Sequence, residues 1–145
     1  MNVLSEARPC EVIIRVGRTE LTERLTQARE SIKEGELLYR EKIGNKVVLA
    51  KLYHAMMYCL FALFDIRDIG KLTHADVIDR FETEYVEKGI IDRGFLDVIR
   101  HAYDLTHECD CEHMPVPSDD DIETTMHAAG EFIHIVDDHL QLIRK

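Results

Sequence analysis

Residues Val47–Phe64, with the sequence VVLAKLYHAMMYCLFALF, form the most apolar stretch of the chain. Only Lys51 and His54 interrupt it with strongly polar groups. A helix that is apolar on nearly every side must be covered on nearly every side. The stretch approaches the length of a membrane span, but charged groups are costly inside hydrocarbon. The sequence therefore predicts a central helix outside any membrane, covered by partner helices, with a second copy of the chain as a further covering surface.

The composition restricts the function and the cellular location of the protein. A chain of 145 residues is long enough for one domain with a real core. The net charge of −10 gives no general attraction for nucleic acid, so any RNA contact needs a local basic patch or a partner. The N-terminus lacks the pattern of a signal peptide. We therefore expect a cytoplasmic protein, and we interpret its four cysteines, Cys10, Cys59, Cys109 and Cys111, as free thiols.

The first 18 residues are the least regular part of the chain. Pro9 and Gly17 are expected to interrupt helix formation, and the residues between them fit a short strand, an irregular arm or the start of the first helix. From Thr19 onward, apolar residues recur every three to four positions, as in an amphipathic helix. The sequence therefore predicts an N-terminal arm over residues 1–18 and one helical domain over residues 19–145.

Capping signals define the remaining helices. Gly44 ends the first helix, and Thr73 opens the third, which Gly89 ends. A fourth apolar periodicity begins at Phe95, and Ser118, followed by three aspartates, opens the last helix. The loops are short, and the chain contains no internal repeat. The sequence therefore predicts an all-α fold, an up-and-down helical bundle of about five helices.

The densest group of chemically active side chains lies in Arg100–His113, RHAYDLTHECDCEH. Arg100 and His107 are seven residues apart, which places them on one face of a helix. His can act as acid or base near neutral pH, and the planar guanidinium of Arg can stabilise a phosphate transition state. The pair therefore fits metal-independent RNA cleavage. The simpler alternative is a solvated helix end whose polar groups only cap and pair.

Zinc binding is a weaker interpretation of the same segment. His107, Cys109, Cys111 and His113 all have side chains that bind zinc. Structural zinc sites, however, use two separated pairs of ligands, and residues two apart in a helix point away from each other. A disulfide between Cys109 and Cys111 would be strained at this spacing. We therefore favour no metal site in this segment.

The last helix carries a second polar stripe, formed by His127, Glu131, His134 and Asp138. Glu131 and His134 have the spacing used in di-iron bundles, but the chain offers no second such pair. We prefer a structural role for the stripe, and we interpret His54 as a hydrogen-bonded core histidine. The chain lacks a glycine-rich phosphate loop, a Ser-His-Asp signature and a His-Glu-x-x-His motif, so no cofactor is expected.

Several stretches resemble HEPN-domain proteins, specifically the small helical-bundle proteins associated with minimal nucleotidyltransferases. Lys51–Phe64 is similar to the aromatic-rich second helix of that family. Thr73–Ile91 is similar to its Thr-His…Phe…Val…Gly-Ile pattern, and Ala102–Cys111 to the segment where many relatives have Arg followed by Ala-Asp-Tyr. Ser118–Leu140 is similar to the closing helix. The resemblance leaves the N-terminal arm outside.

The resemblance implies an all-α bundle that forms a homodimer and belongs to a toxin–antitoxin pair. Active relatives carry an Arg, a polar residue directly after it and a His farther along, which Arg100, His101 and His107 match. In a second register, the Arg falls at Thr106 and His113 becomes the distal His. The resemblance thus implies metal-independent RNA cleavage at a dimer-interface site. The alternative, which Thr106 favours, is a non-enzymatic dimer that binds a nucleotide or a nucleotidyltransferase antitoxin.

Overall fold

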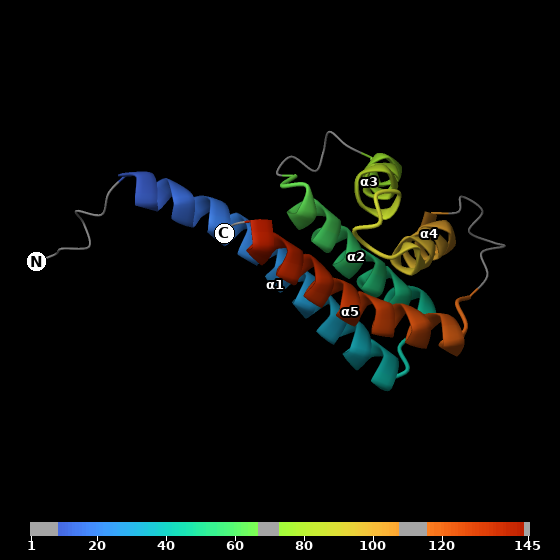
Figure 1. Ribbon diagram of the computed structural model, residues 1–145. Helices are drawn as coiled ribbons and strands as arrows, with labels where there is room; N and C mark the ends of the chain where they lie inside the picture. The colour runs from blue at the N-terminus through green and yellow to red at the C-terminus, as the bar shows by residue number, and fades with distance from the viewer. Residues whose placement is uncertain (1–8, 67–72, 108–115, 144–145) are drawn as a thin grey trace, which may run out of the picture.

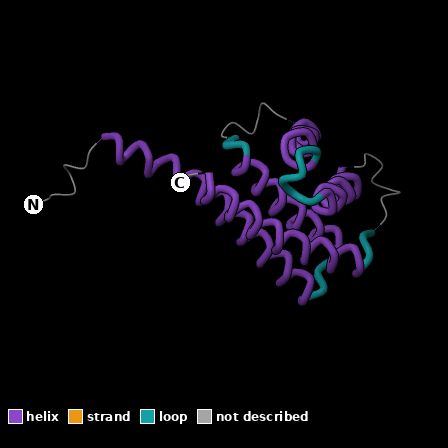
Figure 2. The backbone as a smooth tube through the Cα atoms, in the orientation of Figure 1, coloured by secondary structure: helices purple, strands orange, loops and turns teal. Residues whose placement is uncertain are grey.

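The computed structural model describes residues 9–66, 73–107 and 116–143, and these residues are almost entirely helical (Figures 1 and 2). No strand occurs in these three ranges. The described elements follow one another as α1 (Pro9–Arg40), α2 (Asn45–Leu63), α3 (His74–Phe81), the π-helical turn η3 (Glu82–Val86), α4 (Arg93–His107) and α5 (Asp119–Ile143). The predicted all-α helical bundle is therefore confirmed.

Helix α2 is the centre of the bundle, as its apolar sequence predicts. It contacts α1, α3, α4 and α5 of the same chain, and Val48, Leu52 and Leu60 are fully buried. By length and composition alone α2 could cross a membrane, but 67% of its apolar window is buried inside the bundle. Core burial therefore accounts for its composition, and four helices of the same chain cover most of it.

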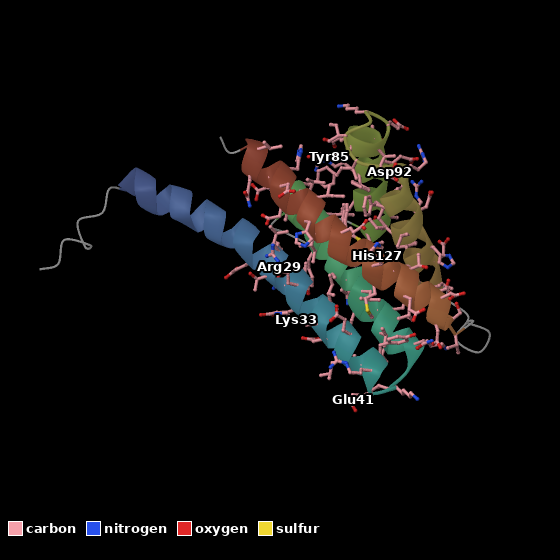
Figure 3. All side chains as sticks on the ribbon, turned by 60° about the horizontal axis from the view of Figure 1, so that its bottom comes forward. Arg29, Lys33, Glu41, Tyr85, Asp92 and His127 are labelled. Carbon is pink, nitrogen blue, oxygen red and sulfur yellow. The ribbon has the colours of Figure 1, made fainter. Side chains whose placement is uncertain are left out.

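The three long helices and the two short ones run in different directions. In Figure 1, α1, α2 and α5 run side by side along one diagonal, whereas α3 and α4 are seen nearly end-on beside α2. Figure 3 shows side chains filling the space between α1 and α5, with Arg29 of α1 at this contact. The Arg29 guanidinium lies 3.3 Å from the Asp137 carboxylate of α5. Helix α4 contacts α3 on one side and α5 on another.

The beginning of α1 differs from the expectation for the N-terminal arm. The helix begins at Pro9 and continues through Gly17, so the predicted break is wrong. Proline is favoured at the first helical position, where its missing N–H has no partner to lose. A single interior glycine costs only about 1 kcal/mol relative to alanine, which a long helix tolerates. The first turns of α1 extend past the other helices (Figure 1), and the expected boundary at residue 19 lies inside α1.

The predicted caps are confirmed at both later helix starts. The Thr73 hydroxyl accepts a hydrogen bond from the Asp76 backbone N–H at 3.1 Å. Ser118 and Asp121 form a reciprocal capping box, in which each side chain accepts from the backbone N–H of the other at 3.1 Å. Gly89 ends the segment after η3 with a φ of 74°, a conformation that favours glycine. The sequence did not indicate the π-helical turn.

Candidate functional site

Three members of the predicted catalytic group, Arg100, His101 and His107, lie on α4 within the described residues. They contact different neighbouring elements. Arg100 contacts α3 and η3, His101 contacts α5, and His107 contacts α2 and α3. Arg100 and His107 therefore both contact α3, from two positions along α4. His113, Cys109 and Cys111 lie outside the described residues.

Arg100 is held by carboxylates of the neighbouring segment. Its guanidinium donates to Asp79 at 3.1 Å and to Glu82 at 2.8 Å, and Arg93 donates to the other oxygen of Glu82 at 3.2 Å. The hydrogen bond from Arg100 is the main reason that the pKa of Glu82 is lowered, and the same bond raises the pKa of Arg100. These ion pairs attach α4 to α3 and η3 through the Nη2 atom of Arg100.

His101 belongs to a different surface. Its Nε2 lies 3.2 Å from a carboxylate oxygen of Asp121 in the first turn of α5. Asp121 also accepts a hydrogen bond from the Ser118 backbone, which is the main cause of its lowered pKa. His101 therefore pairs with the start of α5, and the described contacts do not bring it together with Arg100 or His107.

His107 sits in a group of aromatic rings at the end of α4. Its ring stacks on Tyr103, with centroids 4.2 Å apart, and meets the ring of Tyr53 edge-on at 5.3 Å. Its Nδ1 lies 3.1 Å from the Tyr103 carbonyl oxygen and 2.8 Å from the Thr106 hydroxyl. A carbonyl oxygen can only accept, so Nδ1 is the donor and carries the proton. In the neutral ring, Nε2 then carries the lone pair, and no residue within the described ranges hydrogen-bonds to it.

Tyr53 and His74 form a hydrogen-bonded pair beside His107. The Tyr53 hydroxyl lies 2.8 Å from His74 Nδ1, and Tyr53 is only 1% exposed. Burial raises the pKa of Tyr53, so its hydroxyl keeps its proton. Burial also lowers the pKa of His74, and the nearby His107 and His54 lower it further.

His74 is the residue of this group that the sequence reasoning missed. It follows the Thr73 cap, and its position as the first residue of α3 gave no local reason to assign it chemistry. Its contacts with Tyr53 and His107 depend on how α3 crosses α2 and α4. The only signal in the sequence was the Thr-His pair within the stretch that resembles the HEPN pattern.

His54 differs from its expected role. It lies on the exposed side of α2, and it makes no hydrogen bond with any residue that the structure describes, so the interpretation as a hydrogen-bonded core histidine is wrong. Together with Ser31, Lys51 and Tyr58 it lines a cavity of about 250 Å³ between α1 and α2. The physical reason is that His54 lies at the edge of α2. Its neighbours Tyr53 and Ala55 are buried, but the His54 side chain reaches solvent.

The structure supports no metal centre in the part of the chain that it describes. Within that part, no three His, Cys, Asp or Glu side chains converge well enough to hold an ion. On α5, His127 pairs with Glu131 at 2.8 Å, and both are well exposed (Figure 3). With Glu36 of α1 and His134, they line an open groove of about 480 Å³. The stripe therefore occupies the boundary between α1 and α5.

Comparison with known proteins relates the chain to toxins. No family model matches the sequence. The chain is 23% identical over 117 residues to the protein named "Putative toxin MJ0142" of Methanocaldococcus jannaschii, which covers 81% of this chain and 79% of that protein. It is 24% identical over 116 residues to "Putative toxin MJ0605" of the same organism, covering 80% of this chain and 85% of that protein. The likeness extends over most of all three chains and supports a toxin-type function.

Proposed function

We propose that the protein is a HEPN-type toxin that cleaves RNA without a metal ion, with His107 as the general base. The observation that carries this proposal is the hydrogen bond between His107 Nδ1 and the Tyr103 carbonyl oxygen, because it leaves Nε2 free to accept a proton. His107 is exposed at the end of α4, where RNA can reach it. The likeness to two proteins named as toxins supports the same class of function.

Arg100 has a supporting role in this proposal. Its guanidinium already binds Asp79 and Glu82 through Nη2, so part of its charge is directed at carboxylates of the same chain. In the arrangement described here, Arg100 fixes α4 against α3 and thereby fixes the helix that carries His107. Arg100→Ala should therefore lower both the stability and the cleavage rate, whereas His107→Gln should abolish cleavage without changing the melting temperature.

RNA cleavage is tested directly with purified protein. Wild type, His107→Gln and Arg100→Ala are incubated with total cellular RNA in the presence of a chelator, and new RNA ends are mapped by sequencing. We expect new ends with wild type and none with His107→Gln. Expression of each variant in a bacterial host gives the second readout, growth arrest. A wild type that creates no new ends and does not arrest growth contradicts the proposal.

A non-enzymatic partner of a nucleotidyltransferase is the second candidate function. The net charge of −10 favours it, because such a chain repels RNA at long range, and the carboxylates on Arg100 favour it as well. Purified protein would then bind the nucleotidyltransferase encoded in the same genome with unchanged affinity in His107→Gln. A wild type that cleaves RNA, or that does not bind the nucleotidyltransferase, contradicts this candidate.

We propose a homodimer as the form in solution for both functions. This proposal rests on the resemblance to HEPN-domain proteins. Light scattering should give a mass of twice 16.8 kDa. A concentration-independent mass of one chain contradicts the dimer and any site that needs residues from two copies.

A further inference from the structure

A second histidine lies beside His107, and nothing in the catalytic pattern from the sequence accounts for it. His74 begins α3, and its ring meets His107 nearly edge-on, with centroids 5.7 Å apart. The ring of Tyr53, from α2, contacts both histidines at 5.6 Å and 5.3 Å. Three helices therefore bring two imidazoles to one place, and a buried tyrosine lies against both.

We infer that His74 is a second catalytic residue, the general acid that acts together with His107, and that Tyr53 is the positioning residue that orients it. This inference rests on the proposed RNA cleavage, because the acid is needed only if the site breaks a phosphodiester bond. It adds to that proposal by assigning the proton donor for the leaving group.

The hydrogen bond to Tyr53 determines which nitrogen of His74 is available. In the imidazolium, Nδ1–H donates to the Tyr53 oxygen 2.8 Å away, which leaves Nε2–H to be given to a substrate. After that transfer the neutral ring still carries the Nδ1 proton, so the hydrogen bond to Tyr53 persists. The ring needs no reorientation during the step. His107 has the complementary arrangement, in which Nδ1 carries a proton and Nε2 has a lone pair.

The two histidines together balance the proton transfers of RNA cleavage. His107 Nε2 takes the proton of a ribose 2′-hydroxyl, and the 2′ oxygen forms a bond to the neighbouring phosphorus. The bond from phosphorus to the 5′ oxygen of the next nucleotide breaks, and His74 Nε2–H gives its proton to that oxygen. The products are a 2′,3′-cyclic phosphate and a free 5′-hydroxyl. No electron is transferred, and no co-reactant is required.

The surroundings of His74 predict how the rate depends on pH. Among the described residues, the titratable groups that act on it are Tyr53 and His54 from α2 and His107 from α4. Burial is the main reason that its pKa lies below the ordinary value of 6.5, and the two histidines lower it further. The imidazolium is therefore lost as the pH rises through this lowered pKa. The value of kcat/KM for RNA should fall along an alkaline limb that lies below pH 6.5.

The test compares four variants on two substrates with a chelator present. RNA has a poor leaving group and needs an acid, whereas a uridine 3′-(p-nitrophenyl phosphate) has a good leaving group and needs none. His74→Gln, which can still hydrogen-bond to Tyr53, should lower kcat/KM on RNA by about 100-fold or more and lose the alkaline limb. It should retain nearly full activity on the nitrophenyl substrate. His107→Gln should lose activity on both substrates.

Tyr53→Phe and His54→Gln complete the set. Tyr53→Phe keeps the ring packing and removes the oxygen that accepts from the imidazolium, so the alkaline limb should move to lower pH. His54→Gln removes an exposed histidine that lowers the pKa of His74, so the alkaline limb should move to higher pH while the maximal activity on RNA is retained. Thermal melting followed by circular dichroism confirms that each variant is folded.

The outcomes separate this inference from the proposed function. A wild type that cleaves RNA while His74→Gln cleaves it equally well overturns the role of His74 and leaves the proposed function intact. The same holds if His74→Gln loses activity on both substrates, since a loss that a good leaving group does not rescue is structural. A wild type that cleaves neither substrate overturns the proposed function, and the inference with it.

Discussion

Thr106 shows how one side chain determines what the site can do. Its hydroxyl bonds back to the Ala102 carbonyl oxygen at 2.8 Å and lies 2.8 Å from His107 Nδ1. In one register of the resemblance to HEPN-domain proteins, this position belongs to the Arg. A threonine side chain carries no positive charge. The Arg100 guanidinium, which fits the other register of the resemblance, is hydrogen-bonded to the carboxylates of Asp79 and Glu82. A cation beside His107 is therefore the component that this described site lacks.

Replacing Thr106 with arginine should supply that component. A guanidinium next to His107 can bind phosphate with two parallel hydrogen bonds. We expect Thr106→Arg to raise kcat/KM on RNA by about tenfold or more. Thr106→Lys is the matched control, since it adds the charge without the planar fork, and its gain should be smaller. An unchanged or reduced rate in Thr106→Arg would contradict this account of the site.

Two helical glycines have opposite surroundings. A Cβ added to Gly35 of α1 would lie 3.2 Å from a methyl carbon of Leu52, which is fully buried. A Cβ added to Gly130 of α5 would meet no atom within 4 Å. Gly35 therefore permits the close contact of α1 with α2, whereas Gly130 only weakens its own helix.

Alanine at the two positions should change stability in opposite directions. Gly130→Ala should raise the free energy of unfolding by about 1 kcal/mol, the usual difference in helix propensity. Gly35→Ala gains the same propensity, but its Cβ would press on the buried Leu52 side chain, and we expect it to lower the free energy of unfolding by about 1 kcal/mol net. Urea unfolding measures both values. Equal stabilisation in the two variants would show that Leu52 yields without cost.

The ion pairs between η3 and α4 make the attachment of these elements sensitive to acid. The hydrogen bond from Arg100, together with that from Arg93, lowers the pKa of Glu82 below its ordinary value of 4.5. The unfolded chain therefore binds this proton at a higher pH than the folded chain does. The stabilisation is fully present above that ordinary value and is lost as the pH falls through the folded pKa.

Glu82→Gln should flatten this dependence. The wild-type melting temperature should fall more steeply than that of the variant as the pH is lowered from about 5 to about 3. Arg100→Met removes the main cause of the shift and should flatten the curve in a similar way. Calorimetry across this pH range gives the melting temperatures. Parallel curves for wild type and Glu82→Gln would mean that this ion pair contributes no pH-dependent stability.

The charge of the entire chain should govern how RNA reaches the site. A net charge of −10 repels a polyanion, and the arginines of the α3–α4 junction are paired with carboxylates. Salt screens this repulsion. Added salt should therefore leave kcat/KM on RNA unchanged or raise it, unlike the steep losses of proteins that bind through many phosphate contacts.

Measuring kcat/KM on RNA between about 50 mM and 200 mM salt tests this expectation. The nitrophenyl substrate serves as a control, since its single charge should make its rate nearly independent of salt. A decrease of several orders of magnitude on RNA would indicate a basic RNA-binding surface that the described ion pairs do not reveal.

The sequence alone determined the fold class, the central helix and most helix ends. These features follow from patterns that are local in the chain: the nearly continuous apolar run of α2, the Thr73 cap on Asp76, and the capping box of Ser118 with Asp121. The start of α1 at Pro9 was missed, because proline at the first helical position and proline inside a helix have opposite effects.

Only the tertiary structure decided the partners of the reactive side chains. The sequence placed Arg100 and His107 on one face of α4, but it contained no sign that Arg100 would bind Asp79 and Glu82 or that His107 would meet His74. Tyr53 and His74 are 21 residues apart, and they meet because α3 crosses α2 at this point. Local hydrogen bonds and apolar periodicity set the helices, whereas the packing of whole helices sets which side chains touch.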